Sequence, residues 1–165
     1  MQKCDLMPAW LFALLAAGFV LYTDDYVIAG ILPELSSDLG VSESHAGQLI
    51  TAFSLTVAIM APIAAVVLAK VPRRRLFTVG LCLFALANGL AVVVPSYSLL
   101  MVLRVVAAMA AAGMTPAVFA FAAERAPADK TGRYIAIVSL GVTGSIAAGV
   151  PIGTWIGGHF GWRTC

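Results

Sequence analysis

Charged residues are scarce in this sequence. Asp, Glu, Lys and Arg together make up 11% of its 165 residues, whereas a soluble domain carries about 25%. Apolar residues reach 61% and the mean hydropathy is +0.98, and a soluble globule of that composition would expose large apolar patches and aggregate. The shortage of charge therefore excludes an ordinary soluble domain and predicts a chain that lies mainly in lipid.

Signals for several other functions are missing as well. No stripe of Lys and Arg interleaved with aromatic residues is present, so nucleic acid is not an expected partner. The three cysteines, Cys4, Cys82 and Cys165, are far apart and show no metal-site spacing, and Cys82 is interpreted as a packing residue. The sequence contains no Gly-rich phosphate loop, HExxH motif or nucleophile elbow. We therefore expect no enzyme, no metal and no cofactor.

Long apolar runs are what the sequence has in abundance. A helix needs about 20 apolar residues to cross a hydrocarbon core of about 30 Å, and five segments reach that length. The first run is longer than the core of a secretory signal, so a cleaved signal peptide is not expected. The sequence predicts an all-α membrane protein with about five transmembrane helices, joined in part by a polar loop over 33–45. The predicted spans cover residues 8–32, 46–69, 76–94, 98–121 and 134–158.

Basic residues are distributed unevenly between the two sides of these spans. Eight Lys and Arg residues fall on the side of Lys3, the 70–75 turn and the 124–133 loop, whereas Arg163 falls alone on the other side. Because Lys and Arg accumulate in cytoplasmic loops, the N-terminus is expected in the cytoplasm and Cys165 outside. The turn that contains Lys70, Arg73 and Arg74 is expected to be an orientation signal and an anchor for lipid headgroups.

Three charges lie inside the predicted spans, where charge is costly and usually functional. Asp25 precedes Pro33 by eight residues and Arg104 follows Ser96 by eight, so both lie about 12 Å from the outer ends of their helices. We expect Asp25 to be the interior acid beside Arg104, with Asp24 as a second acid that faces a cavity. The alternatives are acids that snorkel to the interface and a purely structural ion pair.

The last span carries small residues at every fourth position. Such a stripe allows another helix to approach closely, and Pro151 within it is expected to bend the helix. One interpretation is an interface that rocks during function, and the other is static tight packing. The stripe consists of Gly141, Ser145, Gly149, Gly153 and Gly157.

Four stretches resemble motifs of the Major Facilitator Superfamily, in particular the bacterial drug:H⁺ antiporters of the chloramphenicol-resistance and arabinose-efflux branch. Residues 22–33 are similar to the span-1 motif, 65–74 to the loop motif between spans 2 and 3, 103–113 to the span-4 motif and 149–153 to the span-5 antiporter motif. In the loop motif only Arg73 and Arg74 match well. The usual Gly, Asp, Arg and Gly are replaced by Ala65, Ala69, Lys70 and Pro72.

The resemblance implies that residues 1–165 form an incomplete six-helix N-terminal bundle of a twelve-span transporter whose C-terminal half is absent. The implied function is proton-coupled efflux of small, fairly apolar molecules, antibiotics such as chloramphenicol among them, from the cytoplasm across the bacterial inner membrane. The implied partners are the substrate, protons, the lipid bilayer and the missing half, and the proton gradient supplies the energy without a cofactor. Asp25, Arg104 and Asp24 would couple protons, Tyr22 and Tyr26 would line the substrate cavity, and the fifth span would pack on the missing half.

Two other functions stay open at this stage. One is export of sugars or nucleosides by a transporter of the same superfamily. The other is a truncated membrane fragment that does not transport.

Overall fold

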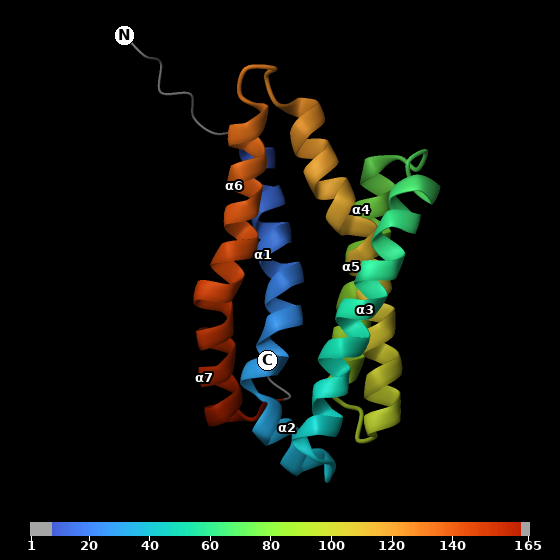
Figure 1. Ribbon diagram of the computed structural model, residues 1–165, viewed down its shortest axis with the longest axis vertical. Helices are drawn as coiled ribbons and strands as arrows, with labels where there is room; N and C mark the ends of the chain where they lie inside the picture. Colours follow the sequence, from blue (N-terminus) through green and yellow to red (C-terminus); the bar gives the residue numbers. More distant parts are fainter. Residues whose placement is uncertain (1–7, 163–165) are drawn as a thin grey trace.

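A computed structural model describes residues 8–162 of the chain (Figure 1). Lys3, Arg163 and the two terminal cysteines, Cys4 and Cys165, lie outside these residues. The elements are α1 Ala9–Gly30, α2 Leu32–Leu39, α3 Glu43–Val67, α4 Arg73–Ala91, α5 Tyr97–Arg125, α6 Thr131–Gly144, a π-helical turn η1 Ser145–Gly149, and α7 Val150–Phe160.

Five helical segments of the described chain are long and apolar enough to cross a membrane. They are α1, α3, α4, α5 and the continuous run from α6 through η1 to α7. Their outer surface is strongly apolar: Val66 is 77% exposed and Leu86 is 63% exposed, as expected for side chains that face lipid tails. The prediction of an all-α protein with about five membrane helices is confirmed.

The segment 33–45 is not the continuous loop that the sequence suggested, because α2 occupies its first half. Pro33 lies in the first turn of α2, where its fixed φ suits a helix and its missing N–H is not needed. Gly40 ends the helix in the left-handed conformation at φ 64°. Leu35 is buried at 1% exposure, so α2 packs an apolar face against the end of the bundle opposite the 70–75 turn (Figure 1).

The spans form two groups that lie side by side in Figure 1. In one group α5 packs along both α3 and α4, and in the other α1 packs along α6, η1 and α7. The middle of α5 is rich in buried alanine, so its neighbours can approach closely. Between the groups, α1 also contacts α3 and α5, and this crossing places the centre of α1 beside the centre of α5.

The small-residue stripe of the last span is buried against α1. A side chain added at Gly141 would meet the backbone carbonyl of Leu15, and one added at Gly153 would meet the side chain of Val27. At Gly149 the added Cβ would lie 2.5 Å from the Thr23 hydroxyl. The expected close helix approach therefore occurs within this half of the bundle. The expectation that this span also packs on the missing half stays a prediction.

A π-helical turn lies directly before Pro151, and the bend expected at this proline stays a prediction. The N–H of Val150 donates to the carbonyl of Ser145, five residues back, and Pro151 follows directly in the first turn of α7. Proline has no N–H and its ring crowds the preceding turn. A wider turn before it is a common way for a helix to absorb such a residue.

Candidate functional site

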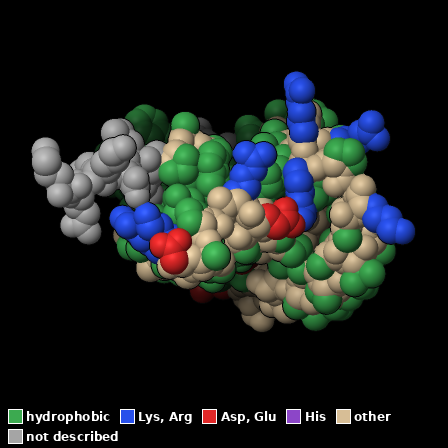
Figure 2. Space-filling view, turned by 90° about the horizontal axis from the view of Figure 1, so that it is seen from above, with side chains coloured by type: hydrophobic (Ala, Val, Ile, Leu, Met, Phe, Trp, Pro, Cys, Tyr) green, Lys and Arg blue, Asp and Glu red, His purple; other side chains and the backbone are tan. Residues whose placement is uncertain are grey.

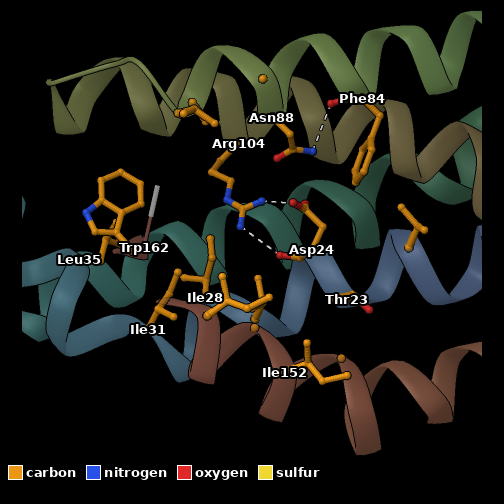
Figure 3. A pocket seen from close by; sticks show the side chains of 18 of the residues that line it. Thr23, Asp24, Ile28, Ile31, Leu35, Phe84, Asn88, Arg104, Ile152 and Trp162 are labelled. Atoms are coloured by element: carbon orange, nitrogen blue, oxygen red, sulfur yellow. Dashed lines mark hydrogen bonds and ion pairs between the residues drawn. The ribbon is translucent and has the colours of Figure 1, made fainter. Parts of the chain in front are cut away.

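An ion pair between α1 and α5 lies at the centre of the candidate site (Figure 3). The Arg104 guanidinium donates from Nη1 to Oδ2 of Asp24 at 2.7 Å and from Nη2 to the backbone carbonyl of Asp24 at 3.0 Å. The two side chains are 7% and 17% exposed. The guanidinium also lies 5.5 Å from the ring centroid of Phe53 on α3. Two charges in an apolar interior are tolerated only when they are paired and hydrogen-bonded in this way.

Asp24, and not Asp25, is the partner of Arg104. Equal depth in the membrane could not separate two adjacent acids, because successive helical residues point about 100° apart. The rotation of α1 is fixed by its packing, since Leu15, Thr23 and Val27 face the small-residue stripe. That rotation turns Asp24 toward α5. The prediction that Asp25 pairs with Arg104 is therefore corrected, whereas the predicted pairing of Arg104 with an acid of this span holds.

Asp25 lies on a different face of α1, together with Tyr22 and Tyr26. Its Oδ1 atom is buried and has no hydrogen-bond partner among the described residues. The rings of Tyr22 and Tyr26 stack with a centroid distance of 6.4 Å, and Tyr26 is 37% exposed. The residues that the sequence suggested as one site therefore lie on two faces of α1: Asp24 faces Arg104, and Asp25 lies with the two tyrosines.

The ion pair lines a groove of about 560 Å³ bounded by α1, α4, α5 and the η1–α7 segment. Its walls are mainly apolar and include Val27, Ile28, Phe84 and Ile152. Figure 3 shows Asp24 and Arg104 pointing toward each other between these walls. The stretch of α1 that lines the groove runs from residue 19 to 28, which is about 14 Å of helix.

Asn88 on α4 is a polar lining residue that the sequence analysis missed. Its Nδ2 donates to the carbonyl of Phe84 at 3.1 Å. The sequence search considered full charges only, and an amide inside an apolar span would have signalled this residue.

The residues of the basic turn lie at one end of the bundle, far along the helices from the ion pair. Arg73 pairs with Glu124 at the end of α5, with 2.7 Å between Nη2 and Oε1, and both side chains are partly or largely exposed. Lys70 and Arg74 are exposed. Figure 2 looks onto this end and shows many Lys and Arg side chains with few acids among them. Among the described residues, the Lys and Arg side chains of the 70–75 turn and the 124–133 loop therefore gather at the same end of the bundle (Figure 2).

Comparison with known proteins gives consistent matches. The chain is 37% identical over 157 residues to a chloramphenicol resistance protein of Streptomyces lividans, covering 95% of this chain and 40% of that protein. It is 36% identical over 154 residues to the uncharacterized MFS-type transporter YbcL of Bacillus subtilis (strain 168), covering 93% and 40%. It is 30% identical over 153 residues to the inner membrane transport protein YdhP of Escherichia coli (strain K12), covering 93% and 39%.

The chain spans about two fifths of the length of these curated relatives. The model of the Major Facilitator Superfamily matches residues 14–165, from the first span to the last residue. Together with the membrane-spanning helices, this match confirms the resemblance found in the motifs. The chain is a multi-pass membrane protein and belongs to the Major Facilitator Superfamily.

Proposed function

We propose that these 165 residues form the N-terminal part of a proton-coupled exporter of small, fairly apolar molecules. The observation that carries the proposal is the Asp24–Arg104 ion pair, buried between two membrane helices in an apolar groove. Ionisable groups at membrane depth are costly and typically mark proton or substrate pathways. A carboxylate in this position can take up a proton from one side of the membrane and release it to the other.

The ion pair gives protonation a direct mechanical consequence. A proton on the Asp24 carboxylate removes its negative charge and so weakens the charge-assisted bond from Arg104. Because Asp24 lies on α1 and Arg104 on α5, the proton changes the attraction between the two helix groups. A ligand or proton can shift a two-state protein only through such a difference in affinity between the states. Asp25, with its unpaired buried oxygen, is a second proton acceptor in this scheme.

Substrate would lie on the face of α1 that carries Tyr22 and Tyr26. Stacked aromatic rings beside an acid offer an apolar surface with polar edges. Chloramphenicol or a molecule of similar size and polarity is the proposed substrate class, supported by the name of the Streptomyces relative. The proposed location is a bacterial cytoplasmic membrane, with the basic end of the bundle in the cytoplasm.

The test is a chimera that joins residues 1–165 to the remaining part of the Streptomyces chloramphenicol resistance protein. In everted vesicles with an imposed proton gradient, addition of chloramphenicol should release protons in exchange for drug uptake. Asp24→Asn should abolish this exchange while the protein still inserts. Asp129→Asn removes an exposed carboxylate outside the spans and should leave the exchange unchanged. A chimera that inserts normally but exchanges no protons for drug would refute the proposal.

A further inference from the structure

Trp162 closes one end of the groove that holds the ion pair. It lines the groove together with Leu35 of α2 and Leu100 of α5, and its ring packs against the buried cluster to which these two leucines belong. Figure 3 shows Trp162 beside Leu35, with Asp24 further along the groove. The groove runs along membrane-spanning helices, so water can enter it only from an end, because the surrounding hydrocarbon holds none. At the α2 end, the Trp162 ring lies across that path.

A hydrogen bond holds the indole in this place. Nε1 of Trp162 donates to Oδ2 of Asp38 at 2.9 Å, although the two residues are 124 positions apart. Asp38 belongs to α2, which packs on α3, whereas Trp162 follows the end of α7, which packs on α1. The bond therefore joins the two helix groups at this end of the bundle. Tryptophan suits the position, because its ring is apolar and its N–H needs a polar partner.

The turn that brings Trp162 to the groove depends on Gly161. Helix α7 ends at Phe160, and Gly161 adopts φ 88° and ψ 147°. Glycine takes such a conformation readily, whereas a residue with a Cβ is strained there. Among the described residues, none beyond the chain neighbours of Gly161 comes within 4 Å of the place of a Cβ. The backbone conformation, and not a lack of space, therefore calls for glycine.

We propose that Trp162 is a plug for the groove: its ring closes the α2 end, Asp38 holds it there, and release of the bond admits water toward the ion pair. Ile28, one helical turn from Asp24 on α1, lines the stretch that the plug shields. A movement of one helix group against the other would break the bond, since its two ends belong to different groups. The plug can be tested without transport. Its use as a gate for protons rests on the proposed function.

The experiment measures how fast a water-soluble thiol reagent labels a cysteine at position 28. The purified chain is placed in lipid nanodiscs, with Cys4, Cys82 and Cys165 changed to serine and with Ile28→Cys introduced. Ile28 is buried and lines the groove, so labelling should be slow while the plug is closed. Trp162→Phe keeps a ring but loses the N–H, and it should speed labelling about fivefold, the effect of one partly exposed hydrogen bond. Trp162→Ala removes the ring and should speed labelling further.

Matched controls separate opening of the plug from general loosening. Gly161→Ala should speed labelling, because its backbone no longer favours the turn, whereas Gly158→Ala, earlier in α7, should not. Trp155→Ala removes an exposed indole of the same helix that lies outside the groove, and it should leave the rate unchanged. In a separate set of variants the single cysteine comes from Val138→Cys, at a fully buried position outside the groove. It should stay unlabelled, and where it reacts, that variant is unfolded and the milder Trp162→Phe decides.

Two results would overturn the proposal. Equal labelling of Ile28→Cys with and without the Trp162 ring would mean that the ring does not control access to the groove. The double variant of Trp162→Phe with Asp38→Ala should label at about the rate of Asp38→Ala alone, because both changes remove one bond. Effects that multiply would mean that Asp38 does not hold the indole. Export is judged separately, since an inactive chimera with a working plug would refute the proposed function alone.

Discussion

Removing Arg104 while leaving Asp24 is the most demanding test of the buried pair. Arg104→Ala eliminates two hydrogen bonds, of 2.7 and 3.0 Å, and the contact with Phe53. It leaves a carboxylate that is only 17% exposed without its cation. Breaking a buried pair on one side costs about 3–5 kcal/mol. Since Asp24 keeps some exposure, we expect the lower end, about 3 kcal/mol, which is a loss of about 150-fold in the folded-to-unfolded ratio.

Three companion variants identify the cause of that loss. Arg104→Lys keeps the charge but cannot form both bonds with one planar group, so it should recover only part of the stability. The double variant Asp24→Asn with Arg104→Leu removes both charges and should unfold close to the wild type, because no unpaired charge remains. Asp25→Asn in the Arg104→Ala background should rescue little, since Asp25 is not the partner.

The assay is equilibrium unfolding of the purified chain in mixed micelles with increasing SDS, followed by far-ultraviolet circular dichroism. The reasoning about the pair is refuted if Arg104→Ala unfolds at the wild-type SDS fraction. It is also refuted if the double variant is less stable than Arg104→Ala alone, because the charge of Asp24 would then not be the source of the penalty.

Two further predictions concern the packing of α1 and the orientation of the chain. Gly141→Ala should destabilise the chain by about 1–3 kcal/mol in the same assay, because its Cβ meets the backbone carbonyl of Leu15, which cannot rotate away. Gly158→Ala, with nothing within 4 Å, should be neutral or slightly stabilising, and equal effects at the two sites would contradict the packing. An alkaline phosphatase fused after Cys165 should be active, whereas one fused at Lys130, at the basic end, should be inactive; the reverse pattern would invert the proposed orientation.

The sequence was sufficient to predict the membrane-spanning helices, because length and apolarity decide whether a helix can cross a bilayer. It also located an acid of the first span beside Arg104, since depth follows from residue counting. It favoured Asp25 over Asp24, which was wrong, because the rotation of α1 depends on which side chains meet the stripe on another helix. The helix α2 was missed because its Pro, Ser and Asp residues resemble those of a loop, although Leu32, Leu35 and Leu39 share one face.

The sequence therefore predicted the depth of the candidate site in the membrane, but it did not predict which side chains face one another there. Asn88 carries no charge and belongs to the third span, so no one-dimensional pattern connects it to Asp24. The two line the same groove only because α1, α4 and α5 all border it. The substrate face with Tyr22 and Tyr26 stays a prediction.

The π-helical turn η1 has a consequence for the register of the last span. A stripe at every fourth position turns by about 40° per step around an α-helix of 3.6 residues per turn. Four such steps, from Gly141 to Gly157, would rotate the stripe by about 160° and carry its far end away from α1. The wider turn at Ser145–Gly149 reverses part of that rotation, so Gly153 still meets Val27. Removing Ile146, Ala147 or Ala148, which lie in η1 but not in the stripe, would therefore turn the half of the span after η1 relative to α1 while every residue of the stripe is kept.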